Sequence, residues 1–117
     1  MGADQVELIC SSSGGVLRDL VTLARAGCET AYIDGSEQIL SLHVNSAVKQ
    51  LGESYRRGLG PEHVNILLRL DKERSIDLAS SSSIELLVTG RVLEYSATDF
   101  RVHPALRALI LPPEHND

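Results

Sequence analysis

The apolar residues of this chain change from helical to alternating spacing after Gly90, and that change limits the possible folds more than any other feature. From Val16 to Gly90 they recur at steps of three and four residues, as one face of an α-helix requires. Between residues 91 and 103 apolar and polar residues alternate instead, which is typical of β-strands. The sequence therefore predicts a mainly α-helical protein with one β-hairpin.

The second helical segment has the longest amphipathic pattern. Serine and glycine at residues 11–15 end a first short helix, because these residues favour turns and caps over helix interiors. Ser13 is predicted to be the N-cap of the next helix, which extends to Asp34 and Gly35. The stripe expected to be buried consists of Leu17, Leu20, Val21, Ala24, Cys28 and Ala31. An adjoining polar edge is formed by Arg18, Thr22, Arg25 and Glu29.

Further helices are predicted downstream. Ser41 is expected to cap a helix with a buried stripe of Val44, Ala47, Val48, Leu51 and Tyr55. Pro61 suits the first turn of the next helix, where its missing N–H costs nothing. The serines at 80–83 could form a linker. A helix over residues 81–89 is preferred, because Ile84, Leu87 and Val88 follow at helical spacing and Gly90 closes the segment. A last short helix is predicted over residues 105–110.

The predicted hairpin pairs residues 91–95 with residues 100–103 around a polar turn. Helix, helix and hairpin is the local order of a winged-helix domain. An isolated hairpin is marginally stable in water, so this one must pack on the helices before it. We expect a helical segment over residues 1–40, a winged-helix-like domain over 41–111 and a disordered tail over 112–117.

The charge balance disfavours binding to nucleic acid. Sixteen acidic residues oppose eleven lysines and arginines, which leaves a net charge of −5, and no basic run stands out. Aromatic residues for base stacking are also few. No segment approaches the ~20 apolar residues of a membrane span, and no signal peptide opens the chain. The expectation is a cytoplasmic protein without membrane contact.

Side chains that support catalysis or metal binding are not grouped in a recognisable pattern. No metal-ligand spacing relates the histidines His43, His63, His103 and His115. Cys10 and Cys28 are expected to be buried free thiols. His103 is expected to cap or pack at the start of the last helix. The sequence predicts no catalytic residue and no metal ligand.

Three segments resemble parts of one protein family. Residues 12–20, SSGGVLRDL, which continue into LARA at 23–26, resemble the sensor 2 helix of AAA+ ATPases. Residues 39–48, ILSLHVNSAV, look like the next lid helix of the same proteins. Residues 84–110, IELLVTGRVLEYSATDFRVHPALRALI, are similar to the winged-helix tail of some prokaryotic AAA+ and STAND-like ATPases.

The resemblance implies a helical lid subdomain followed by a winged-helix-like domain, both detached from an ATPase core. The loop Gly-x-x-x-x-Gly-Lys-Ser/Thr, which holds phosphates and Mg²⁺, is absent from the sequence. The chain is therefore expected not to be an enzyme and to bind no cofactor alone, whereas its parent would use ATP and Mg²⁺. The expected partners are the missing core and partner proteins or sister subunits.

Arg18 is the principal site residue that the resemblance implies. In the family an early arginine of this helix faces the nucleotide, and a guanidinium can bind a phosphate in bidentate fashion. Gly14 and Gly15 precede the helix, where backbone N–H groups can bind an anion. These residues would bind the cofactor only with the missing core. Arg18 is expected to lie beside the apolar stripe with no buried carboxylate near it. Read without the family, Arg18 is a solvated arginine paired with a nearby carboxylate.

Two other functions stay open at this point. One is a winged-helix DNA-binding module with residues 81–89 as recognition helix. That helix contains Glu85 and no lysine or arginine, whereas groove-binding helices carry basic or amide side chains, so DNA binding is disfavoured. The other is a small protein-interaction adaptor unrelated to ATPases.

Overall fold

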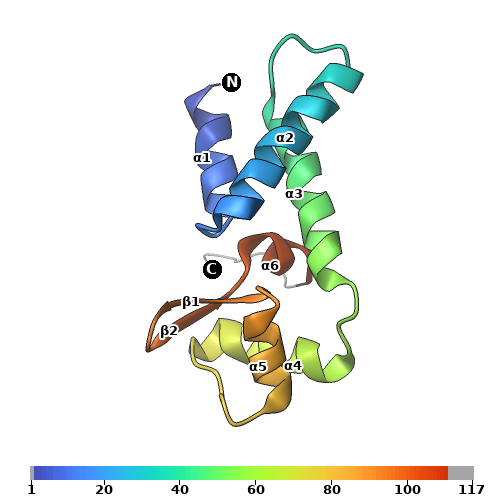
Figure 1. The fold of residues 1–117 in the computed structure, drawn as a ribbon. Helices are drawn as coiled ribbons and strands as arrows, with labels where there is room; N and C mark the ends of the chain where they lie inside the picture. The colour runs from blue at the N-terminus through green and yellow to red at the C-terminus, as the bar shows by residue number, and fades with distance from the viewer. Residues whose placement is uncertain (1, 111–117) are drawn as a thin grey trace, which may run out of the picture.

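The computed structural model describes residues 2–110 (Figure 1). Its elements are α1 (Ala3–Ser12), α2 (Leu17–Ile33), α3 (Ser41–Arg56), α4 (Pro61–Glu73), α5 (Ser81–Val88), β1 (Val92–Ser96), β2 (Asp99–Val102) and α6 (Pro104–Ile110). The prediction of a mainly α protein with a winged-helix-like order of helices and one hairpin is confirmed. The tail predicted over residues 112–117 lies outside the described residues.

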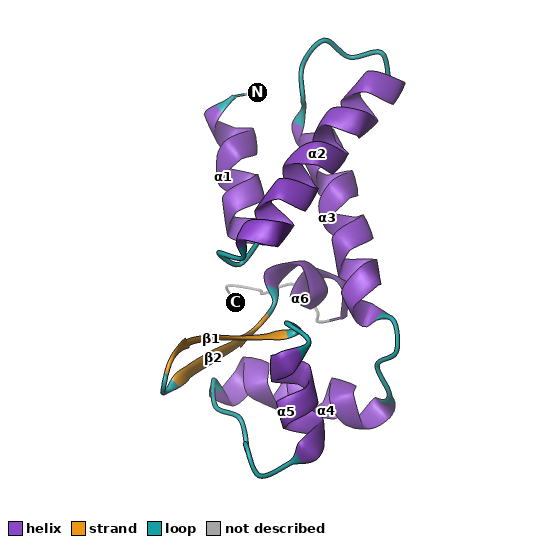
Figure 2. Cartoon of the chain, viewed as in Figure 1, coloured by secondary structure: helices purple, strands orange, loops and turns teal. Residues whose placement is uncertain are grey.

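Helix α3 is the centre of the arrangement. α1 and α2 lie beside one part of it and α6 lies beside its other end, while α4, α5 and the hairpin form the opposite end of the molecule (Figures 1 and 2). α3 and α6 approach so closely that any Cβ at Gly52 would clash with the carbonyl oxygen of Ala105. Only glycine allows this backbone contact.

One hydrophobic core connects the two ends. Buried side chains from α1, α2 and α3 continue through α6 to α4, α5 and the hairpin. Its buried members are Ile9, Leu23, Val44, Ala47, Leu51, Tyr55, Leu67, Leu70, Leu86, Val92, Phe100, Val102, Ala105 and Leu106. The marginal hairpin is thereby stabilised by the helices, as expected. The boundary predicted near residue 40 stays a prediction.

Helix α2 buries a face that is rotated from the predicted one, although Ala31 is buried as predicted and Leu20 and Ala24 pack partly buried against the core. Its buried residues are Asp19, Leu23, Gly27 and Ala31, whereas Leu17, Val21 and Cys28 are exposed. The rotation turns Asp19 inward, where the Tyr55 hydroxyl and His103 Nε2 lie within hydrogen-bonding distance of its carboxylate. The prediction of buried thiols is also wrong, since Cys10 and Cys28 both lie on solvent-facing sides of their helices.

Helix α5 shows a similar shift. Ser83 and Leu86 are buried, while Ile84 and Val88 of the predicted stripe are exposed. With eight residues, α5 has little pattern of its own, and its contacts with α4 and β1 decide which side is covered. The Ser80 hydroxyl accepts a hydrogen bond from the Ser83 N–H, which confirms a helix start instead of a linker.

Histidines at the third position of α3 and α4 bind the backbone N–H of the N-cap residue. The Leu40 N–H donates to His43 Nδ1 at 2.9 Å, and the Gly60 N–H donates to His63 Nδ1 at 3.1 Å. Each imidazole takes the place of the Glu or Gln of a capping box. The prediction that Ser41 caps α3 is wrong, because Leu40 is the N-cap and its backbone N–H donates to the His43 ring.

Candidate functional site

The turn between α1 and α2 belongs to the segment that suggested a nucleotide-facing helix. Gly14 and Gly15 have positive φ angles of 65° and 81°, which favour glycine. The Ser13 hydroxyl donates to the Cys10 carbonyl at 2.8 Å and accepts from the Gly15 N–H at 3.3 Å. Ser13 therefore caps the end of α1, and the prediction that it caps α2 is wrong because two glycines separate it from that helix.

The same turn is attached to the hairpin. The Tyr95 hydroxyl donates to the Gly14 carbonyl at 2.9 Å, and a Cβ on Gly14 would lie 2.9 Å from Pro104 Cδ. The Gly14 N–H donates to the Ser11 carbonyl at 3.3 Å. The N–H groups of Gly14 and Gly15 are thus engaged within the turn, and an anion would have to replace these hydrogen bonds.

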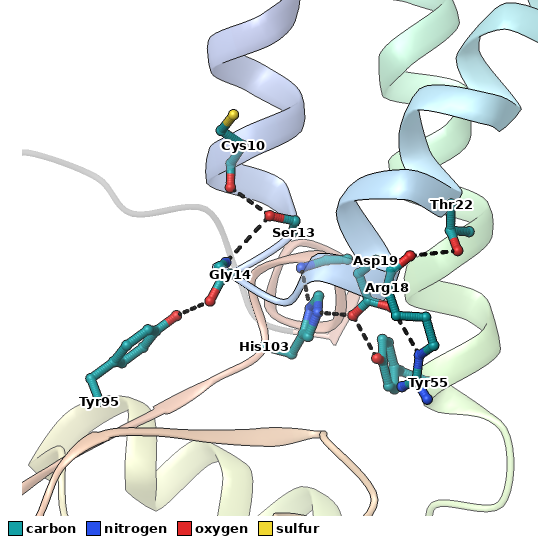
Figure 3. A network of polar contacts seen from close by, with 11 residues as sticks. Cys10, Ser13, Gly14, Arg18, Asp19, Thr22, Tyr55, Tyr95 and His103 are labelled. Atoms are coloured by element: carbon teal, nitrogen blue, oxygen red, sulfur yellow. Dashed lines mark hydrogen bonds and ion pairs between the residues drawn. The ribbon is translucent and has the colours of Figure 1, made fainter.

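Asp19 is the centre of a buried polar cluster in the first turn of α2 (Figure 3). Its side chain is 3% exposed. The Tyr55 hydroxyl donates to Asp19 Oδ2 at 2.6 Å, and His103 Nε2 lies 2.8 Å from the same oxygen. Buried carboxylates persist only when paired and hydrogen-bonded, and these contacts, from α3 and from the β2–α6 junction, meet that condition.

Both ring nitrogens of His103 are engaged. Nδ1 accepts from the Ala105 N–H at 3.1 Å, which confirms that His103 caps the start of α6. Nε2 must then carry the proton that Asp19 accepts, a tautomer assigned from these partners. Burial lowers the pKa of His103, although Asp19 opposes the effect. The neutral ring packs against Tyr55, with 4.6 Å between ring centroids, and holds its neighbours in place.

Arg18 extends outward from this anchored turn. Its side chain is 78% exposed, and Nε lies 3.9 Å from Asp19 Oδ1. Hydrogen bonding and charge attraction to Tyr55, followed by Asp19, raise the pKa of Arg18. The expectation that Arg18 has no buried carboxylate near it is therefore wrong. It fails because the neighbouring Asp19 points inward and still keeps one oxygen close to the guanidinium.

An exposed apolar stripe runs along α2 next to Arg18. It consists of Leu17, Val21, Cys28 and Tyr32, which share one side of the helix at 3.6 residues per turn. Leu17 is 74% exposed and Tyr32 is 86% exposed. Arg25 lies on the exposed polar edge of the same helix, as expected. We call Leu17, Val21, Cys28 and Tyr32 the α2 stripe.

Sequence reasoning missed Asp19 and Tyr55 as site residues. One signal was available, since Asp19 lies four residues before Leu23 and eight before Gly27 on the buried arc of α2. Its partners are 36 and 84 residues away, and sequence alone does not place them beside it. Among residues 2–110, no group of three or more histidine, cysteine or acidic side chains could hold a metal ion.

Comparisons with protein-family models, curated proteins and solved structures gave no match for this chain. No helix within the described range is both long and apolar enough to cross a membrane.

Proposed function

We propose that this chain is the C-terminal lid and winged-helix-like region of a cytoplasmic AAA+-type ATPase. In this role it is a regulatory, non-catalytic part that senses nucleotide through Arg18. Catalysis, ATP and Mg²⁺ belong to a core domain outside the chain. The remaining surface contacts partner proteins or sister subunits.

The observation that carries the proposal is the α2 stripe beside Arg18. Large apolar side chains that line one side of a helix and have no partner mark an interaction surface. A core domain that covers the stripe would bring its bound nucleotide towards the guanidinium on the same helix. The two arginines of α2, Arg18 and Arg25, border the stripe in a chain of net charge −5, which suits a partner surface carrying phosphate.

Arg18 also has the geometry of a positioned contact. Its neighbour Asp19 is fixed by Tyr55 and His103, so the first turn of α2 cannot rotate freely. A guanidinium presented from a rigid helix loses less conformational entropy when it binds than one on a mobile loop. The pairing with Asp19 Oδ1 is long, at 3.9 Å, which leaves the exposed group able to bind a phosphate.

The surface of α5 supports protein contact over DNA contact. Ile84 is 45% exposed and Val88 is 78% exposed, and Glu85 is exposed between them. An apolar, acidic helix suits another protein better than a DNA groove. A gel-shift assay at physiological salt is expected to give at most weak, sequence-independent binding. Nanomolar, sequence-selective binding would replace this proposal with a DNA-binding function.

Two steps test the ATPase assignment. The first is the DNA upstream of this reading frame, where a Walker motif within ~200 residues, about one further domain, is expected. The second joins that core to this chain and compares ATP hydrolysis by the Arg18→Ala and Arg25→Ala variants. Loss of Arg18 is expected to slow hydrolysis by about 100-fold, as for other groups that stabilise transition-state charge, and loss of Arg25 is not. Equal rates in the two variants would contradict a sensing role for Arg18.

A further inference from the structure

Asp19 joins the exposed Arg18 to the hairpin. Its Oδ1 faces Arg18 Nε at 3.9 Å, while its Oδ2 takes the hydrogen bonds from Tyr55 and His103. Within residues 2–110, no other charged side chain lies within ion-pair distance of Asp19. One oxygen of the carboxylate thus faces the exposed arginine, and the other accepts hydrogen bonds from Tyr55 of α3 and from His103, which directly follows the hairpin (Figure 3).

His103 connects three further segments. Its backbone N–H donates to the Arg91 carbonyl at 2.9 Å, next to the start of β1, and it directly follows β2. Its ring accepts the Ala105 N–H at the start of α6. Arg91 in turn donates to the Tyr55 carbonyl at 2.6 Å. His103 therefore joins the Asp19 cluster to both strand ends through its backbone and to α6 through its ring.

A second attachment lies on the other side of the same turn. The Tyr95 hydroxyl bonds to the Gly14 carbonyl, five residues before Asp19. Tyr95 lies at the irregularity in the strand pairing between Glu94 and Ser96. Bulged residues are locally unpaired and re-aim their side chains. The start of α2 is thus attached to the hairpin on both sides of Arg18.

We propose that Asp19 is a positioning residue that couples the state of Arg18 to the hairpin and α6 through His103. The inference rests on the proposed function, in which Arg18 alternates between Asp19 and a phosphate. When the guanidinium turns to the phosphate, Asp19 loses its cation. Hydrogen bonds from the uncharged Tyr55 and His103 alone then stabilise its buried carboxylate, and these hydrogen bonds and the strand ends readjust. A ligand shifts such an equilibrium only through contacts that differ between the two states, and the Arg18–Asp19 contact is one.

Tyr55 provides a second signal, which reports the Arg18 guanidinium itself, because Arg18 interacts directly with the Tyr55 hydroxyl. Burial is the largest cause that raises the pKa of Tyr55, the hydrogen bond to Asp19 adds to it, and Arg18 opposes both. Removal of the Arg18 guanidinium should therefore raise the pKa of Tyr55 further. Tyr32 and Tyr95 are exposed, which separates them from Tyr55 in a spectroscopic titration.

The test is nuclear magnetic resonance on the full 117-residue chain without nucleotide, comparing wild type with Arg18→Ala, Arg18→Lys and Arg25→Ala. Arg18→Ala is expected to shift the His103 ring nitrogen signals and the backbone amide signals of Val102 and Ala105, and to raise the tyrosinate midpoint of Tyr55. Arg18→Lys is expected to restore most of the wild-type signals, because it keeps a cation near Asp19. Arg25→Ala, on the same helix but away from Asp19, is expected to leave them unchanged.

A double variant that combines Arg18→Ala with Asp19→Asn tests whether the effect of Arg18 on His103 passes through Asp19. If the Asp19→Asn chain folds, Arg18→Ala is expected to cause no further shift at His103 in its background. Arg18→Ala shifts confined to the first turn of α2, or equal His103 shifts in Arg18→Ala and Arg25→Ala, would overturn the coupling. No nucleotide is used, so this outcome is independent of whether the parent protein is an ATPase.

Discussion

The junction at Asp19 and the loop between α2 and α3 each contain a carboxylate–histidine pair, and the two pairs differ in how deeply the carboxylate is buried. In both, a carboxylate faces histidine Nε2 while Nδ1 accepts a backbone N–H at a helix start: Asp19 with His103 at 2.8 Å, and Asp34 with His43 at 3.1 Å. Both rings are fully buried, but the Asp19 side chain is 3% exposed and that of Asp34 is 63% exposed.

The difference lies in what each pair connects. Asp34 and His43 are nine residues apart, so their contact closes a local loop. Asp19 and His103 are 84 residues apart and hold the first turn of α2 against the end of the hairpin. Water can replace a lost partner at Asp34 and cannot at Asp19. Burial, more than geometry, therefore decides how much each pair matters for stability.

The largest expected effect is the loss of the buried carboxylate. Asp19→Ala leaves the Tyr55 hydroxyl and His103 Nε2 without their partner in the core, and breaking such a buried pair costs about 3 kcal/mol or more. Asp34→Ala is the matched control, with an expected loss below about 0.5 kcal/mol. Urea unfolding followed by circular dichroism measures both. Similar losses in the two variants would show that burial does not separate these regions.

A pair of glycines tests the second attachment of the same turn. Gly14→Ala and Gly15→Ala both place a Cβ at a positive φ, but only the Cβ on Gly14 meets other atoms, at 2.5 Å from Leu93 Cδ1 of β1 and 2.9 Å from Pro104 Cδ of α6. We expect Gly15→Ala to cost about 1 kcal/mol from backbone strain and Gly14→Ala to cost about 1 kcal/mol more. Thermal unfolding of the two variants gives the difference. No difference between them would mean that the turn is not tightly held against the hairpin.

The pH dependence of stability sharpens the comparison further. The pKa of His103 is lowered from 6.5 by burial, so the unfolded chain binds more protons than the folded chain between the two values. The stabilisation is complete above pH 6.5 and is lost as the pH falls towards the lowered pKa, at up to about 1.4 kcal/mol per unit. Urea midpoints from pH 7.5 to 5 measure the slope. His103→Gln should make the slope shallower, and an unchanged slope would assign it to other groups.

The smallest expected effect is at Arg18. Its side chain is 78% exposed and its ion pair with Asp19 is long, at 3.9 Å, so Arg18→Ala should leave the urea midpoint of the chain close to that of the wild type. Its removal is expected to change the spectroscopic signals of His103 and Tyr55 and, in the proposed ATPase, the rate of hydrolysis. Unfolding of the chain by Arg18→Ala would make Arg18 a structural residue and contradict the sensor proposal.

The sequence was sufficient to predict the elements. Gly35 and Gly90 closely follow helix ends in the structure, and Pro61 is the first residue of α4, as predicted. The change to alternating apolar residues after Gly90 correctly predicted the position of the hairpin. These signals are local, because they depend on the positive φ angles that glycine allows and on the backbone N–H that proline lacks. Local signals can be read without knowing which other segments are near.

The buried faces of α2 and α5 could not be predicted in the same way. The α2 stripe has regular apolar spacing, yet the structure buries the neighbouring arc that contains Asp19 and Gly27. Periodicity shows that a helix has an apolar side and does not show what covers it. The buried carboxylate of Asp19 is stabilised by hydrogen bonds from Tyr55 and His103. Only the tertiary fold brings these two residues beside it.

The position of α6 has a consequence for folding during synthesis. Asp19 leaves the ribosome long before His103, and at 5–20 residues per second the 84 intervening residues take roughly 4 to 17 s. During that interval α2 and α3 can pair, but the carboxylate lacks the histidine and the Gly52 side of α3 lacks α6. Native structure in this chain should therefore appear late, after α6 has emerged, and a nascent chain arrested earlier should remain open to proteases.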